Sequence, residues 1–279
     1  MRSMTIFGVR LDDMTSDELH ARLLELLDKP TPSLVVTPNP EFLLAARSDS
    51  AFRDVLNSSV LSIPDGVALR FAAAANDGAH NLHRHPGVDV LPELATMCRD
   101  RGVILVLLGA TNFILAQTKM RFATLAEGVS IVTVNPGFID AENPKLAQHL
   151  IDDLCLIGPC VVAVALGQGS GRSQGKQECV AAQIVAEVPN VRIVIGVGGA
   201  FDALSGSVRR APLVLRRLGF EWAWRLAIEP WRFRRIFRAT ILFPIIVAYG
   251  TVRAGTFGRA LIHVASELRN HFFSRSSSV

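Results

Sequence analysis

The chain has 279 residues, of which 49% are hydrophobic and 19% are charged, and its formal net charge is +4. This composition indicates a globular protein with a sizeable core, and its positive mean hydropathy predicts an apolar surface that contacts a membrane or a partner. The four cysteines lack CxxC spacing and companion histidines, which excludes a recognisable zinc or redox motif. The segment after Met1 lacks the apolar core of a signal peptide, so we expect a cytoplasmic protein.

Apolar strand-like runs alternate with helix-like segments as far as about residue 197, a pattern typical of a mostly parallel sheet. Several runs are continuously apolar, as expected of strands covered on both faces. We therefore predict an α/β fold, with a doubly wound, Rossmann-like sheet sandwiched by helices. The expected strands are 33–37, 60–63, 103–108, 130–134, 161–166 and 192–197. The expected helices are 16–27, with a capping signature at 15–18, and 41–48, 67–75, 90–101, 112–126 and 144–157.

Two of the first predicted strands lead directly into polar turns, at 37–41 and at 64–66. Pro64 and Gly66 constrain the turn around Asp65, so a carboxylate is presented from rigid backbone. Ligands of open α/β sheets bind at the carboxyl ends of strands. Asp65 is therefore the first candidate catalytic residue.

Histidines and an acid cluster at 83–89, but nothing in the sequence nominates a third metal ligand for His83 and His85. We therefore expect no metal site here and regard Arg84 as the residue of interest.

Two glycine-rich segments resemble phosphate-binding motifs without matching them. Residues 167–177 have the wrong spacing for a phosphate loop, since Ser170 replaces its first glycine and Gln177 replaces its hydroxyl residue. This segment is expected to be a flexible substrate-contacting loop or lid rather than an ATPase motif. Residues 196–202 fail as a dinucleotide fingerprint, because Phe201 fills the third glycine position. Gly198 and Gly199 either let backbone N–H groups approach a diphosphate or serve tight packing.

The alternation of strand-like and helix-like segments ends before residue 211. We therefore divide the chain into a core, 1–210, and a helical, basic appendage, 211–279. Residues 209–238 hold nine arginines against Glu221 and Glu229, and Trp222, Trp224, Trp231, Phe233 and Phe237 lie between the arginines. This pattern favours a phosphate clamp at a membrane surface over solvated helix faces or nucleic-acid binding. Pro230 is expected to separate two short helices, and 241–249 to be too short to span a membrane. Residues 274–279 are expected to form a disordered tail.

Several motifs share their order with one known family. They are Thr37-Pro38-Asn39-Pro40-Glu41, Pro64-Asp65-Gly66, Arg84 with Gly87 and Asp89, Leu108-Gly109, Lys176-Gln177-Glu178, Gly196-Val197-Gly198-Gly199-Ala200-Phe201-Asp202 and Arg209-Arg210-Ala211-Pro212. Over residues 35–238 the chain thereby resembles the WecG/TagA/CpsF glycosyltransferases, bacterial enzymes of cell-envelope and exopolysaccharide synthesis.

The resemblance implies inverting sugar transfer, without metal or cofactor, from a UDP-sugar to a polyprenyl-diphosphate-linked saccharide. The implied donor sugar is N-acetylmannosamine, its uronic acid, glucose or glucuronic acid. The implied location is the inner face of the cytoplasmic membrane, with peripheral attachment. By motif, Asp65 would be the general base. The expected substrate-binding residues are Thr37, Asn39, Arg84, Gln177, Gly198, Gly199, Arg209, Arg210, Arg225, Arg232 and Arg235.

The chain departs from the family pattern at an insertion, 168–175, and at an extension, 241–279. We expect the extension to give tighter membrane association or a different acceptor, and its apolar surface also allows self-association. Two alternatives stay open: a nucleotide-dependent oxidoreductase, and a non-catalytic membrane-bound assembly protein with the same fold. Nucleic-acid binding ranks last.

Overall fold

The computed structural model describes residues 2–77, 82–166 and 175–273. The expected disordered tail at 274–279 and residues 167–174 of the expected flexible loop lie outside the described residues.

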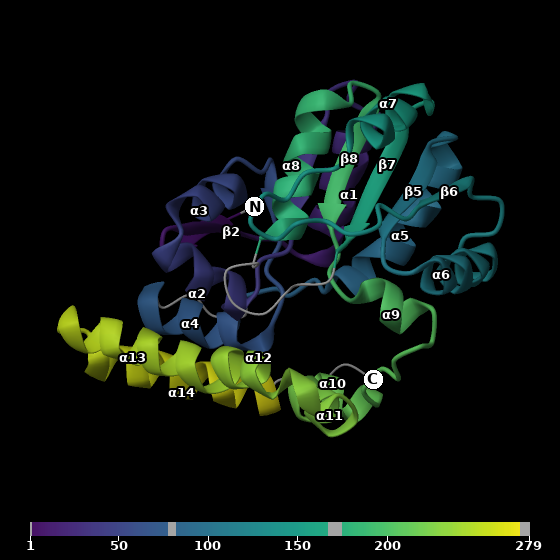
Figure 1. Ribbon diagram of the computed structural model, residues 1–279. Coiled ribbons are helices and arrows are strands. Elements are labelled where there is room, and N and C mark those ends of the chain that lie inside the picture. Colours follow the sequence, from purple (N-terminus) through teal and green to yellow (C-terminus); the bar gives the residue numbers. More distant parts are fainter. Residues whose placement is uncertain (1, 78–81, 167–174, 274–279) are drawn as a thin grey trace.

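A six-stranded parallel sheet in the order β4-β3-β8-β7-β5-β6 forms the centre of the fold (Figure 1). Its strands are β3 (Ser33–Val36), β4 (Leu61–Ser62), β5 (Ile104–Gly109), β6 (Ile131–Val134), β7 (Cys160–Ala165) and β8 (Val191–Gly196). Helices cover both faces. The predicted α/β sandwich is thereby confirmed.

Alternate strand residues enter two separate cores, because successive side chains point to opposite faces of a sheet. Val162 and Val164 of β7 pack in one core, and Val161 and Ala163 pack in the other. The first core includes α2 (Pro40–Ser48), α3 (Ser50–Asn57), α4 (Val67–Asp77), α7 (Gln148–Leu156) and α8 (Lys176–Glu187). The second includes α1 (Ser16–Asp28), α5 (Gly87–Arg101), α6 (Asn112–Leu125) and α9 (Ala200–Leu204). The predicted capping box is present at the start of α1.

The sequence analysis missed an antiparallel hairpin of β1 (Arg2–Ile6) and β2 (Val9–Asp13), and also helices α3 and α8. Helix α8 begins at Lys176, so the end of the expected flexible loop 167–177 is helical instead. Phe7 and Gly8 make the turn with φ values of +52° and +79°. Met4, Ile6, Val9 and Leu11 are buried in the first core, which attaches the hairpin to the sheet. Helix α7 is shorter than the predicted 144–157 and begins at Gln148.

The chain after residue 212 is helical: α10 (Leu213–Arg217), α11 (Glu221–Ile228), η1 (Pro230–Arg232), α12 (Phe233–Phe237), the π-helical turn η2 (Arg238–Leu242), α13 (Phe243–Arg253) and α14 (Phe257–Phe273). In Figure 1, α13 and α14 run side by side along α4.

Pro230 separates two helices as predicted, but the second is not short. Residues Pro230–Arg253 form a continuous helical stretch of 24 residues, so the run 241–249 lies within a longer helix than expected. The π-helical turn before Pro244, where Phe243 N–H donates to Arg238 O, accommodates the proline within the helix. Among the described residues this is the one helix whose length and composition would allow it to cross a membrane, and 17% of its most apolar window is buried.

Candidate active site

The carboxyl ends of β3, β5, β7 and β8 border two adjoining pockets. The inner compartment, of about 330 Å³, lies over the strand ends and includes Thr37, Gln177 and Gly198. The outer compartment, of about 280 Å³, lies between α4 and the C-terminal helices and includes Arg84, Trp222 and Arg225. Four residues line both compartments: Asn39, Asp65, Arg232 and Arg235. The site thus lies where ligands of open parallel sheets bind.

Asp65 is held in the wall between the compartments by its own backbone. Its N–H donates to Pro38 O at 2.8 Å, and the adjacent Pro64 O accepts from His85 N–H at 3.1 Å. Gly66 has φ +115°, and a Cβ there would meet Pro40 Cδ at 3.0 Å, so a side chain would strain this turn. The backbone of Asp65 is thereby fixed relative to the start of α2.

The pKa of Asp65 is raised to about 6, chiefly because the surrounding protein desolvates the carboxylate. The positive charge of Arg84 opposes the increase in pKa, and the negative charges of Glu221 and Asp89 add to it. A carboxylate with a pKa near 6 is a stronger base than an exposed one and is still largely ionised at neutral pH.

Thr37 and Asn39 order the turn that follows β3. Thr37 Oγ1 donates to Gly196 O at 2.8 Å, which joins the ends of β3 and β8. Asn39 Oδ1 accepts from the N–H groups of Glu41 and Phe42 at 3.0 and 3.1 Å and so caps α2. Both predicted pocket residues line the inner compartment.

Gln177 is fixed at both ends of its carboxamide. Its Oε1 accepts from Gly198 N–H at 2.9 Å, and its Nε2 donates to Glu178 Oε1 at 2.7 Å. A Cβ on Gly196 would lie 2.5 Å from Gln177 Nε2, so only glycine leaves room for this contact. Burial raises the pKa of Glu178 to about 7. The Gln177-Glu178 pair therefore shapes the loop at Gly198 and Gly199, which both line the inner compartment.

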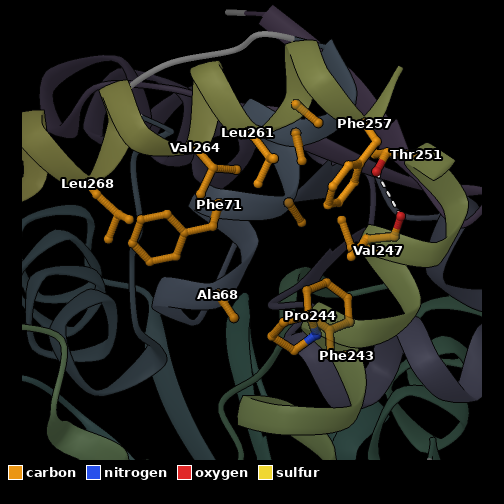
Figure 2. Close-up of a pocket in the computed structure, with 14 residues that line it drawn as sticks. Ala68, Phe71, Phe243, Pro244, Val247, Thr251, Phe257, Leu261, Val264 and Leu268 are labelled. Carbon is orange, nitrogen blue, oxygen red and sulfur yellow. Dashed lines mark hydrogen bonds between the residues drawn. The ribbon is translucent and has the colours of Figure 1, made fainter. Parts of the chain in front are cut away.

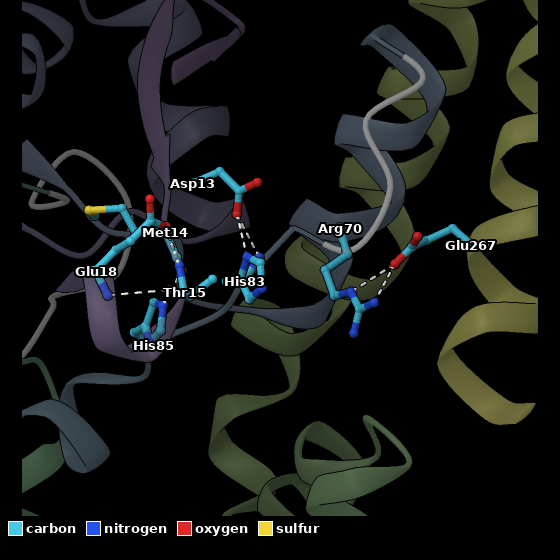
Figure 3. Close-up of polar contacts among 8 residues, drawn as sticks. All are labelled: Asp13, Met14, Thr15, Glu18, Arg70, His83, His85 and Glu267. Carbon is cyan, nitrogen blue, oxygen red and sulfur yellow. Dashed lines mark hydrogen bonds and ion pairs between the residues drawn. The ribbon is translucent and has the colours of Figure 1, made fainter. Parts of the chain in front are cut away.

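Arg84 lies in a loop that its two neighbouring histidines anchor, and Figure 3 shows these histidine contacts. His83 Nδ1 donates to Asp13 Oδ1 at 2.9 Å, and His85 Nε2 donates to Met14 O at 2.8 Å. In the described part of the chain these histidines hold the loop, and no group of three potential metal ligands gathers there. The Arg84 guanidinium lies 3.9 Å from a carboxylate oxygen of Glu221.

Carboxylates hold the predicted arginines of the appendage in place. Glu229 pairs with Arg225 at 2.5 Å and with Arg232 at 2.9 Å, while Arg235 pairs with Glu41 at 2.9 Å. Cations arranged in this way can neutralise a diphosphate.

The structure places Arg209 and Arg210 outside the described lining of both compartments. Arg210 forms an ion pair with Asp89 at 2.7 Å, and its charge lowers the pKa of Asp65. The backbone oxygen of Arg209 accepts from Trp224 Nε1 at 2.9 Å.

The sequence analysis did not select Asp202, Glu229 or Glu41 as site residues. Asp202 lines the inner compartment, and burial raises its pKa against the opposing charges of Arg232 and Arg225. The i,i+4 and i,i+3 spacing of Glu229 from Arg225 and Arg232 is a local signal that could have identified Glu229.

The fold and this site define an α/β protein with a carboxylate of raised pKa in the wall between two pockets that arginines also line. The profile of the "Glycosyl transferase WecG/TagA/CpsF family" matches residues 4–255, and the chain belongs to this family. The resemblance to this family that the sequence motifs indicated is thereby confirmed. The chain is a glycosyltransferase of envelope polysaccharide synthesis rather than an oxidoreductase.

A curated relative is similar over most of its length. It is an "N-acetylglucosaminyldiphosphoundecaprenol N-acetyl-beta-D-mannosaminyltransferase" of Bacillus subtilis (strain 168), 28% identical over 210 residues. The match covers 75% of this chain and 77% of the relative.

Proposed function

We propose that this glycosyltransferase moves a sugar of the N-acetylmannosamine type from a UDP-sugar to a polyprenyl-diphosphate-linked saccharide. The name of the Bacillus subtilis relative supports this transferred sugar and this class of acceptor. The observation that carries the proposal is the position of Asp65, in the wall shared by the two compartments, which Arg232 and Arg235 also line. A base at that position faces a donor on one side and an acceptor on the other.

In the proposed reaction the UDP-sugar occupies the inner compartment and the acceptor hydroxyl enters from the outer one. Asp65 accepts the hydroxyl proton as the acceptor oxygen bonds to the anomeric carbon. The bond from that carbon to the diphosphate oxygen breaks, and UDP leaves with the electron pair. Arg232 and Arg235 stabilise the charge that develops on the diphosphate, in the place of a metal. A single displacement of this kind inverts the anomeric configuration.

We further propose that residues 1–210 form the catalytic core and that residues 211–279 form an appendage at the inner face of the cytoplasmic membrane. Apolar side chains on this appendage are exposed beside its arginines, with Trp231 at 76%, Ile245 at 58% and Tyr249 at 61%. Such neighbours are typical of segments that lie in a membrane interface. Self-association through the same surface is the alternative that a measured mass in solution would reveal.

The first experiment measures UDP release by membrane-reconstituted protein with a panel of UDP-sugars and a lipid-linked saccharide acceptor. Acceptor-dependent release from one donor, reduced at least 100-fold in Asp65→Asn, is expected. Asp152→Asn, an exposed carboxamide substitution on α7, is the matched control and keeps full activity. Binding of UDP without turnover of any donor and acceptor would favour the assembly-protein alternative.

Membrane attachment is tested separately by flotation with liposomes that contain anionic lipid. The triple variant Trp231→Ser, Ile245→Ser, Tyr249→Ser should lose flotation, because it removes exposed apolar side chains and leaves every arginine in place. Equal flotation of the variant and the wild type would refute attachment through this surface.

A further inference from the structure

An apolar groove lies between α4, α13 and α14 and shares no lining residue with either compartment of the site (Figure 2). Its volume is about 320 Å³, within the range of pockets that hold small ligands. Figure 2 shows Phe71, Val247, Leu261 and Val264 facing the open space from three helices. Thr251 is the single polar side chain in the described lining, and its hydroxyl donates to Ala248 O at 2.7 Å. The groove therefore offers an apolar ligand nothing but hydrocarbon surface.

Helix α14, which forms one wall of the groove, begins at Phe257 and lies beyond the residues that match the family. It is fastened to α4 by a buried ion pair, in which Arg70 Nε donates to Glu267 Oε1 at 2.9 Å (Figure 3). Arg70 also contacts His271 Nδ1 at 3.2 Å. Because these polar contacts fix α14 in place, the groove is a built feature of this chain and not a gap between loosely packed helices.

The groove begins where the outer compartment ends. On α4, Val67 lines the outer compartment and the next residue, Ala68, lines the groove. On the long C-terminal helix, Thr240 lines the outer compartment and Phe243 lines the groove. The groove thus continues from the outer compartment along α4 and along the long C-terminal helix.

We propose that this groove binds the isoprenoid chain of the lipid-linked acceptor next to its diphosphate, an inference that rests on the proposed function. The order of chemical groups in such an acceptor is saccharide, diphosphate and polyprenyl chain. That order matches Asp65, then Arg84 and Arg225, which line the outer compartment but not the inner one, then the groove; Arg232 and Arg235 remain for the donor diphosphate. Leu261 and Leu268 line the groove and are 54% and 40% exposed, so a long chain can leave it toward lipid.

The test compares two acceptors with the same saccharide diphosphate, one on a long polyprenyl chain and one on a single isoprene unit, in detergent micelles. Ala248→Phe and Val264→Trp each fill the groove, because their side chains lie in its wall. Each should raise the KM for the long-chain acceptor at least tenfold and leave the KM for the short one unchanged. Ile262→Phe, at a position on α14 that is 70% exposed and outside the groove lining, is the control and should change neither KM. Melting temperatures identify a variant that fails to fold.

A binding measurement separates this inference from the proposed reaction. A polyprenyl diphosphate that carries a diazirine near its diphosphate is photolysed with the full chain, and the adducts are mapped by mass spectrometry. Adducts on Phe71, Val247 or Val264, lost in Ala248→Phe, would support the groove even if no acceptor is turned over. Such a result would leave the inference standing while the proposed reaction fails.

Three outcomes would overturn the groove assignment. Adducts confined to outward-facing residues such as Ile245 and Ile262 would indicate general contact with lipid. A dimer that dissociates on Ala248→Phe would indicate that a second copy of the chain occupies the groove. Equal KM values for the long and short acceptors would show that the chain contributes no binding.

Discussion

Arg235 on α12 and Glu41 in the first turn of α2 are separated by 194 positions in the sequence, yet their Nη2 and Oε2 atoms lie 2.9 Å apart. Glu41 also follows the Asn39 cap that orders the turn beside Asp65. The pair therefore connects the basic C-terminal segment directly to the strand end that carries the candidate site.

Arg235→Ala should weaken both stability and donor binding, because it leaves the buried Glu41 carboxylate without its counter-charge. We expect a loss of about 1–3 kcal/mol in the free energy of unfolding and a tenfold or greater increase in the KM for the UDP-sugar. The double variant Glu41→Gln, Arg235→Ala should regain stability in urea unfolding but not donor affinity. Recovery of both would make Arg235 a structural residue only.

Activity should decrease in acid with the titration of Asp65. Its pKa is raised to about 6, so the base is progressively protonated below that pH. We therefore expect kcat/KM to decrease about tenfold per pH unit below pH 6. Because the charge of Arg84 lowers the pKa of Asp65, Arg84→Gln should move this limb of the profile to higher pH. An unchanged limb in that variant would assign the titration to another group.

Glu178 should make the protein less stable as the pH increases. Its pKa in the folded protein is about 7, against 4.5 for an unperturbed carboxyl. The stability that the bound proton contributes is therefore fully present below pH 4.5 and is lost as the pH rises through 7. Glu178→Gln removes this loss and keeps an acceptor oxygen for Gln177 Nε2. Urea unfolding at pH 8 should show a gain of up to about 3 kcal/mol over wild type, with little difference at pH 4.

Glu178→Ala is the contrasting variant, because it removes the oxygen that positions Gln177. It should increase the KM for the donor, whereas Glu178→Gln keeps it close to wild type. Equal donor KM values in the two variants would show that Glu178 does not position Gln177.

The attachment of α14 should depend on the buried pair of Arg70 and Glu267. Glu267→Ala leaves the buried Arg70 without its carboxylate and should cost about 3–5 kcal/mol of stability. Limited proteolysis should then cleave within α14 before the core. The apolar double variant Arg70→Met, Glu267→Leu should restore resistance, since both charges are removed together. Protection of α14 in the single variant would show that apolar packing alone attaches the helix.

The central strands could be predicted to within about one residue because both faces of the sheet are buried. Cys160–Ala165 is an unbroken buried run, and no alternation is needed to recognise it. The N-terminal hairpin was missed because Phe7-Gly8 is not a typical hairpin turn sequence. Its strands also mix charged and apolar residues over only five positions each.

The sequence also indicated that the arginines of the appendage matter, but not which carboxylates hold them. The pairs of Arg235 with Glu41 and of Arg70 with Glu267 join residues 194 and 197 positions apart. Such contacts depend on the packing of the C-terminal helices against α2 and α4, which leaves no local pattern. The apolar groove could not be predicted from the sequence for the same reason, because three segments that are distant in the sequence line it.

The π-helical turn η2 lies between Arg235, at the site, and Phe243, at the start of the groove. An α-helix advances about 100° around its axis per residue, and a wider turn changes that angle. The turn therefore sets the rotational phase between the face that meets the diphosphate and the face that meets hydrocarbon. Winding the same residues as a regular α-helix would leave both sets of side chains intact and turn one face by about 100° relative to the other.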